Sequence, residues 1–252
     1  MNTKSLVTIT TALCMIFISA CGSLADNEKT IQPSGNLITE ERDLSGFDQI
    51  NLIGVGEVII TQGQEESLSI RADENFMPFV EVDVKGSVLT LGLDTSDEGV
   101  TIRVEDDAYG AMVVFDLVVK DINQIDISDA FGAKIDQLET DKLQIDLSGV
   151  GTLDINSLVA DQLSIHQSGA GAIIISGQVN HQEIVQSGVG NFHAGGLESD
   201  TAVLNISGAG DATVWVKESL DVDISGVGNV VYFGSPQITS KISGVGKLVN
   251  TE

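Results

Sequence analysis

The sequence is poor in basic residues, in aromatic residues and in cysteine. Its 252 residues contain 12 Lys and Arg against 37 Asp and Glu, which gives a formal net charge of −25. A chain this acidic repels polyanions, which disfavours nucleic acid and anionic lipid as direct ligands, whereas divalent cations and cationic surfaces remain open as partners. Aromatic residues make up only 4% and offer little for stacking on sugars. The candidates for an exposed aromatic cluster are Trp215, Tyr232 and Phe233, for which core or edge packing is an equal alternative.

Cysteine occurs only at Cys14 and Cys21, in or beside an N-terminal apolar run. The run from Leu6 to Ala20 is too short for a stable membrane span and ends in small residues, as a secretory signal does. Its end, Ile18-Ser19-Ala20-Cys21, resembles the lipobox of bacterial lipoproteins. That resemblance implies that residues 1–20 are a signal peptide and that Cys21 carries the lipid, with an ordinary secretory signal as the alternative.

Lipidation at Cys21 would tie the exported chain to the membrane of the cell envelope through several acyl chains, which hold more durably than one. Gly22 rather than aspartate follows the cysteine, and in lipoproteins this favours sorting to the outer membrane. The mature chain would have 252 − 20 = 232 residues and no second cysteine. We therefore expect no disulfide, no cysteine zinc site and no thiol nucleophile. Residues 21–40 are predicted to form a lipidated polar tether.

Residues 41–120 alternate between apolar and polar positions in short runs that are separated by turn residues. Two such runs, Val80 to Val84 and Val88 to Leu93, are joined by Lys85-Gly86-Ser87. A period of two between turn residues predicts strands, and this junction predicts a hairpin. Because the runs are irregularly spaced, we predict a small antiparallel cap, with the first coils, that leads into the rest of the chain.

A Ser-Gly-small-Gly motif recurs within residues 121–252. The motifs start at positions 148, 168, 187, 207, 225 and 243, in steps of 20, 19, 20, 18 and 18 residues. A nearly fixed period of this size is typical of a solenoid, in which each repeat buries its apolar side against its neighbours. The predicted corner residues are Ser148, Gly149, Gly151, Ser168, Gly169, Gly171, Ser187, Gly188, Gly190, Ser207, Gly208, Gly210, Ser225, Gly226, Gly228, Ser243, Gly244 and Gly246.

Apolar residues recur at fixed offsets before each motif. One column lies directly before the motif serine, a second lies two residues earlier, and polar residues mostly separate them. The two columns are Ile127, Leu147, Gln167, Gln186, Ile206, Ile224 and Ile242, and Ile125, Ile145, Ile165, Ile184, Leu204, Val222 and Ser240. The alternation predicts one half-buried strand per repeat with both columns inward. The predicted fold is all-β: a right-handed parallel β-helix of 18–20 residues per coil, three-faced and built of short strands.

The motif glycines are expected at the corners, where the coil turns sharply and glycine reaches positive φ without a Cβ penalty. The small residue between them, such as Val150 or Ala170, is expected to point inward at the bend. The serines should stack as a ladder and satisfy amides of neighbouring corners. Farther upstream, Gly54-Val55-Gly56 lacks the third glycine of a nucleotide-binding fingerprint and is interpreted as a strand bend.

These motifs resemble a known family. SGVGNV at 225–230, QSGVGNF at 186–192 and the segment Arg42 to Ile50 followed by Gly54-Val55-Gly56 are similar to the putative auto-transporter adhesin head (GIN domain) family. The resemblance covers residues 41–250. It implies a pectin-lyase-like β-helix, lipoprotein anchoring and an adhesive or cell-envelope role, and it carries over no catalytic residue.

The strongest enzymatic alternative is a polysaccharide lyase or hydrolase, which needs converging carboxylates, often with calcium and an arginine or lysine base. The arginines, Arg42, Arg71 and Arg103, all precede the regular coils. In the column of outward residues, Asp126 and Asp146 are followed by His166 and Asn205, and Asp223 is beside Lys241. This pattern favours a solvated acidic face over a catalytic pair.

No metal site or cofactor is predicted. The histidines, His166, His181 and His193, lie at different offsets from their motifs and share no metal-ligand spacing, so we expect them at the surface. Gly208 to Ala212 resembles a calcium-binding solenoid turn, but Asp211 does not recur in the other repeats. The segment is therefore interpreted as a corner.

The last coil is the predicted site of a protein partner. The end of a β-helix presents unpaired strand edges, so we expect Ile242, Val245, Leu248 and Val249 to self-associate or to dock a partner strand. The leading prediction is a non-catalytic, lipid-anchored envelope protein that presents its β-helix for adhesion or assembly. A polysaccharide-active or carbohydrate-binding protein and a periplasmic stress or assembly factor are the alternatives.

Overall fold

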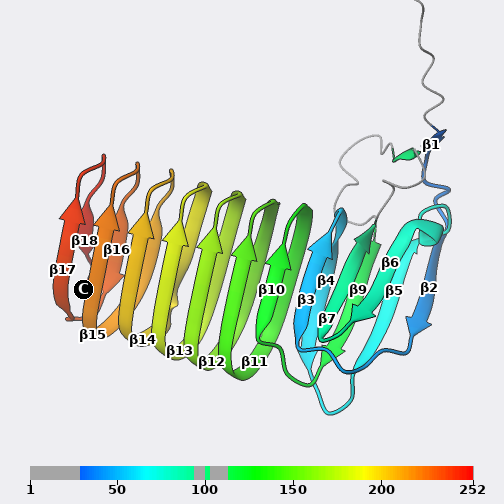
Figure 1. Cartoon of the computed structure of the whole chain (residues 1–252), viewed down its shortest axis with the longest axis horizontal. Coiled ribbons are helices and arrows are strands. Elements are labelled where there is room, and N and C mark those ends of the chain that lie inside the picture. The colour runs from blue at the N-terminus through cyan, green and yellow to red at the C-terminus, as the bar shows by residue number, and fades with distance from the viewer. Residues whose placement is uncertain (1–28, 94–99, 103–112, 252) are drawn as a thin grey trace, which may run out of the picture.

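The computed structural model describes residues 29–93, 100–102 and 113–251. They form an elongated stack of parallel strands with an irregular β cap at the N-terminal end (Figure 1). The described part contains one 3-10 turn, η1 (Met77–Phe79), and no α-helix, so the predicted all-β solenoid is confirmed. Within that part, no helix is long and apolar enough to cross a membrane.

From residue 124 onward the chain winds in coils that stack in sequence order. The strands are β10 (Gln124–Ile127), β11 (Ala130–Leu147), β12 (Val150–Gln167), β13 (Ala170–Gln186), β14 (Val189–Ile206), β15 (Ala212–Ile224), β16 (Val230–Phe233), β17 (Gln237–Ile242) and β18 (Leu248–Asn250). Neighbouring coils pair in parallel register, so Ile145 lies between Ile125 and Ile165. The strands β11 to β14 run unbroken for 17 or 18 residues. The expectation of short strands is wrong because in-register stacking keeps the backbone paired through the bends.

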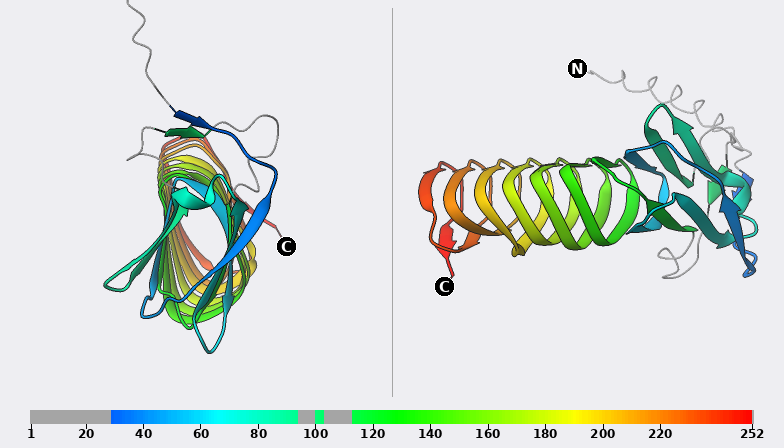
Figure 2. Two further views of the ribbon diagram at one scale, coloured as in Figure 1. Left: turned by 90° about the vertical axis from the view of Figure 1, so that its right-hand side faces the viewer. Right: turned by 90° about the horizontal axis from the view of Figure 1, so that it is seen from below.

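The inward side chains of every coil form one continuous core, and the coils follow one another as a continuous spiral along the axis (Figure 2). In β12 the inward runs include Ile155, Leu158 and Ile165, each at most 1% exposed. Both predicted inward columns are buried from Ile125 to Ile224. In β17 the same positions, Ser240 and Ile242, are exposed, since no described strand lies beyond them.

Two glutamines interrupt the apolar column before the motif serine. Gln167 and Gln186 are 2% and 0% exposed. The Nε2 of Gln167 donates to the carbonyl of Gly171 at 3.0 Å, and the Nε2 of Gln186 donates to the carbonyl of Gly190. A buried amide without a partner costs free energy. Each glutamine is tolerated because its side chain donates a hydrogen bond to a backbone carbonyl of the corner that follows it.

The N-terminal cap contains the first coil of the solenoid. Its strands are β1 (Lys29–Ile31), β2 (Leu37–Arg42), β3 (Gln49–Ile53), β4 (Val55–Gln62), β5 (Ser67–Asp73), β6 (Val80–Lys85), β7 (Val88–Leu93), β8 (Val100–Ile102) and β9 (Val113–Val119). The strands β3 and β4 pair in parallel with β10 and β11 on one side and with β7 and β9 on the other. Later segments of the chain therefore enclose an earlier one.

The antiparallel arrangement predicted for the cap is found only at its outer strands. The strand β6 pairs antiparallel with β7, β5 with β9, and β2 with β5. Gly86, at φ 64°, turns the predicted hairpin between β6 and β7. These strands end the stack at this side, because an antiparallel strand offers no register for another coil.

Candidate functional site

The corner glycines are required by the close approach of neighbouring coils. The amides of Ser168 and Gly169 both donate to the carbonyl of Leu147 at 3.0 Å, and the amide of Ala170 donates to Gly149 at 2.8 Å. A Cβ on Gly169 would fall well inside van der Waals contact with the carbonyl oxygen of Gly149. The predicted reason, positive φ, is wrong for the first glycine of every motif, because none of them has a positive φ.

The small residue of each motif points outward, which corrects the expectation that it points inward. The valines at this position, Val150, Val189, Val227 and Val245, are 64%, 63%, 56% and 72% exposed. Together with two alanines they stack one per coil along one edge of the solenoid, and we call these residues the corner stripe. The corner stripe consists of Val150, Ala170, Val189, Ala209, Val227 and Val245. It is a narrow, regular apolar line facing solvent.

The motif serines do not satisfy the corner amides, so that expectation is also wrong. The amides bond to backbone carbonyls of the preceding coil, and the serines are exposed. A polar ladder forms instead two residues beyond the corner stripe. The amide of Asp211 donates to the Oδ1 of Asn191 at 3.0 Å, and the amide and Nδ2 of Asn229 donate to Asp211 at 2.7 and 3.1 Å. The carboxylate of Asp211 is thereby used within the structure, in agreement with its interpretation as a corner residue.

Asp126 and Asp146 stack on neighbouring coils, as predicted. Gln124 donates to Asp126 at 3.1 Å, Gln144 donates to Asp146 at 2.6 Å, and Nδ1 of His166 lies 3.0 Å from Asp146. Burial, together with the adjacent charge of Asp146, raises the pKa of Asp126. Farther along, Lys241 pairs with Asp223 at 3.0 Å. The column is a set of satisfied acids along the surface.

The other histidines lie apart from one another. His181 is half-buried beside the hydroxyl of Thr201, at 2.8 Å, and His193 is exposed on β14. Among the residues that the structure describes, no group of three or more His, Cys, Asp and Glu side chains could hold a metal ion.

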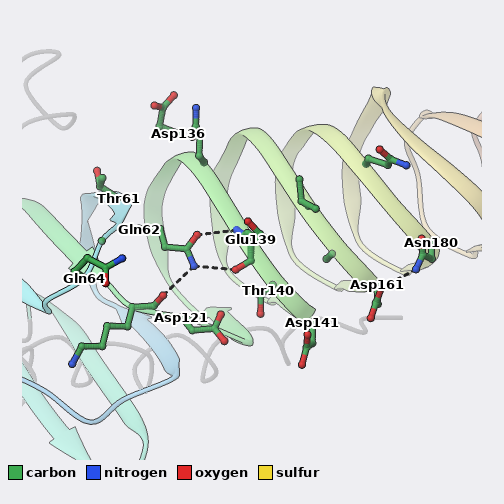
Figure 3. A pocket seen from close by; sticks show the side chains of 16 residues that line it. Thr61, Gln62, Gln64, Asp121, Asp136, Glu139, Thr140, Asp141, Asp161 and Asn180 are labelled. Atoms are coloured by element: carbon green, nitrogen blue, oxygen red, sulfur yellow. Dashed lines mark hydrogen bonds between the residues drawn. The ribbon is translucent and has the colours of Figure 1, made fainter.

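A polar groove of about 910 Å³ crosses the coils where the cap meets the solenoid (Figure 3). Its carboxylates come from Asp121, Asp136, Glu139, Asp141 and Asp161. Gln62 spans the junction: its Nε2 donates to the carbonyls of Lys120 and Glu139 at 3.0 and 2.9 Å, and its Oε1 accepts from the amide of Glu139. Sequence reasoning missed this residue, because only the fold brings residues 62, 120 and 139 together.

Two of the groove carboxylates are bonded to asparagines of the next coil. Asp136 accepts from Asn156 at 3.3 Å, and Asp161 accepts from Asn180 at 2.8 Å. Lys120 extends to Glu66 at 2.7 Å, and this hydrogen bond lowers the pKa of Glu66. The arrangement is a solvated acidic groove suited to polar or cationic contacts.

The remaining predicted site residues are Cys21, the apolar residues of the last coil and three aromatic residues. Cys21 lies outside the described residues. In the last coil Ile242, Val245 and Val249 are 43%, 72% and 41% exposed, and Leu248 is half-buried. Of the aromatic candidates, Trp215 is exposed, Phe233 is half-buried and Tyr232 is buried.

The comparisons with known proteins agree with this architecture. The family described as putative auto-transporter adhesin, head GIN domain, matches residues 46–236. A putative adhesin from Bacteroides fragilis NCTC 9343 is 31% identical, with a TM-score of 0.81, and the match covers 88% of this chain and 100% of that one. The resemblance predicted from the repeated motifs is confirmed.

More distant solved structures share the fold. A putative adhesin from Parabacteroides merdae ATCC 43184 and a putative lipid binding protein from Parabacteroides distasonis ATCC 8503 are 22% and 21% identical, with TM-scores of 0.66 and 0.65. Each match covers 89% of this chain and 100% of the other. The comparison with curated proteins gives no match.

Proposed function

The chain belongs to the putative auto-transporter adhesin, head GIN domain family, and from that premise we propose that it is a non-catalytic adhesin held at the cell envelope by a lipid on Cys21. The observation that carries the proposal is the corner stripe, which presents one small apolar residue per coil and has exposed valines at four of its six positions. A repeating surface offers many equivalent weak contacts, and several weak contacts made together give strong attachment.

The charge of the chain supports a role at a surface. A net charge of −25 keeps a protein soluble and apart from other acidic molecules. Three of the acids described above, Asp136, Asp161 and Asp223, accept hydrogen bonds from side chains of the next coil. Groups bonded in this way are suited to display, whereas glycoside cleavage needs two carboxylates free to act on one bond.

Anchoring is tested with two cysteine variants of the full-length chain expressed in a bacterium. Cys21→Ser removes the acceptor of the lipid, so we expect the protein to move from the membrane fraction to the soluble fraction. Cys14→Ser is the matched control, because it changes a cysteine inside the predicted signal peptide and should leave the protein in the membrane. Retention of Cys21→Ser in the membrane would contradict lipidation at this residue.

Display is tested by treating intact cells with a protease. An adhesin facing outward is degraded, whereas a periplasmic stress or assembly factor is protected. Incubation of the protein with acidic glycans, with and without calcium, tests the enzyme alternative. Robust cleavage in either condition would overturn the non-catalytic role.

A further inference from the structure

The single tryptophan of the chain lies on the outer surface of the solenoid. Trp215, in β15, is 38% exposed. In the next coil its register partner is Phe233, which faces the same side and is half-buried. Tryptophan buries a large apolar area when it packs, so an exposed tryptophan beside a second ring offers an apolar contact surface to a ligand.

A glycine of the preceding coil, Gly195, lies beneath the ring of Phe233. The pairing of β14 with β15 shifts between Ala194 and Glu198, where β14 contains Gly195 and Gly196. A Cβ on Gly195 would lie 3.0 Å from the ring of Phe233 and 3.1 Å from a methyl carbon of Thr213. The ring of Phe233 therefore reaches back over β15 toward β14, where only glycine leaves room for it.

A buried polar chain holds the backbone beneath Trp215. The Nε2 of Gln182 donates to the hydroxyl of Ser199 at 2.8 Å, and that hydroxyl donates to the carbonyl of Trp215 at 2.9 Å. Both Gln182 and Ser199 are 0% exposed. Buried polar groups that are bonded to one another fix a local geometry, so the backbone that carries the tryptophan is held in place.

Charged groups lie beside the aromatic surface. Lys217, two residues after Trp215, contacts Glu198 at 3.0 Å and Asp200 at 2.7 Å. Glu198 is also the register partner of Trp215. The three charged side chains are 35–40% exposed, so their remaining donors and acceptors are open to solvent. We call Trp215, Phe233, Lys217, Glu198 and Asp200 the aromatic platform.

We propose that the aromatic platform binds a neutral oligosaccharide. The C–H face of a pyranose ring is apolar and stacks on an exposed aromatic ring, while its hydroxyls bond to carboxylates and ammonium groups at the edge. The net charge of −25 disfavours an acidic glycan. A quaternary ammonium would require a cage of several rings, and this surface is open with two. The proposal rests on the adhesive role for its biological purpose, but binding in solution does not depend on anchoring.

Because Trp215 is the only tryptophan, its fluorescence reports directly on the platform. We would titrate the purified full chain with cellohexaose and with maltohexaose, and expect a saturable change of emission with at least one of them. Phe233→Ala should weaken binding about fivefold or more, by loss of one stacking partner. Ile174→Ala is the matched control, because Ile174 is 42% exposed and belongs to neither the platform nor the corner stripe. It should bind as the parent does.

Trp215→Phe is followed by calorimetry, because it removes the fluorophore, and a loss of about fivefold or more in affinity is expected. The absence of saturable binding to both oligosaccharides would overturn the proposal. So would preferential binding of polygalacturonate or of tetramethylammonium, since these probe an acidic glycan and a quaternary ammonium. If the protein does not bind either oligosaccharide in solution but is still degraded by protease on intact cells, the glycan site is overturned while the proposed surface display is retained.

Discussion

The cap and the regular coils solve the same problem, burial of apolar strands, in two ways. From β10 onward the order of coils in space is their order in sequence. In the cap, β3 and β4 lie between β10 and β11 on one side and β7 and β9 on the other. The regular coils can be extended by repeating one pattern, whereas the cap encloses its first coil and ends the stack.

The two regions also differ in what fills the core. Aliphatic residues occupy most of the inward positions of the regular coils, together with Gln167, Gln186, Phe192 and Tyr232. Phe47, Phe76 and Phe115 are buried in the cap, and the ring of Phe115 stacks 6.1 Å from that of Phe131 at the junction. Repeated coils need side chains of similar size in register, whereas an irregular cap needs large rings to fill uneven space.

The largest predicted effect breaks the stacking of the regular coils. Gly169→Ala places a methyl group against the backbone of the preceding corner, so we expect unfolding to become easier by about 3 kcal/mol in urea denaturation. Gly132→Ala is the matched control, because its added Cβ would have its nearest neighbours at 3.8 and 3.9 Å, an ordinary contact distance. Equal stability of the two variants would contradict the requirement for close approach at the corner.

The second prediction is that a carboxylate in the cap and one in the regular coils affect the free energy of unfolding with opposite dependence on pH. Burial would raise the pKa of Asp73 in the cap, but amides of Ser34, Asn75 and Gly35 donate to its carboxylate and lower the pKa. Because the pKa is lowered in the folded state, the ionised carboxylate stabilises the fold at pH values above its ordinary pKa of 3.8. This stabilisation is lost as the pH falls through the folded pKa. We expect Asp73→Asn to cost about 1–2 kcal/mol at pH 7, and progressively less below pH 3.8.

Asp126, in the regular coils, should respond with the opposite sign. Its pKa is raised, so the folded state binds more protons and gains stability as the pH falls from the folded pKa toward 3.8. Asp126→Asn should therefore stabilise the protein at pH 7, by less than about 1 kcal/mol because the site is half-exposed and screened by solvent. Urea midpoints at pH 7, 4 and 3 test both variants, and changes of the same sign at pH 7 would refute the contrast.

The smallest effect on stability concerns the edges of the two regions. At the cap, β2 carries Glu40, Glu41 and Arg42, which discourage pairing with another chain. We propose that the last described coil, with Leu248 and Val249, self-associates. Lys substitutions at both positions should lower the mass measured by light scattering and change the free energy of unfolding by less than about 0.5 kcal/mol. A parent protein that is strictly monomeric would argue against self-association.

The inward columns could be predicted from the sequence because their physical cause is local. Alternation places Ile145 and Leu147 on one face of a strand whatever surrounds them. The direction of Val150 could not be found in this way, because alternation is interrupted at the bend and a small residue fits either side. The backbone bonds of the stacked corners decide that it points outward.

The candidate sites were less accessible to sequence reasoning. The first glycine of each corner was identified correctly, but for the wrong reason, because positive φ is a property of one residue and close approach is a property of two coils. Gln62, Lys120 and Glu139 meet only because the cap folds back onto the first coil. The pairing of Lys217 with Glu198 and Asp200 depends on a register shift in β14 that no repeat predicts.

By itself, the sequence determined the repeat, the all-β solenoid and the residues that fill its core, because period and apolar alternation act within a single coil. Only the tertiary structure decided which way the corner stripe points, how the cap encloses its first coil and where Trp215 meets Phe233. These features depend on the distance between backbones of different coils, and that distance exists only once the coils have stacked.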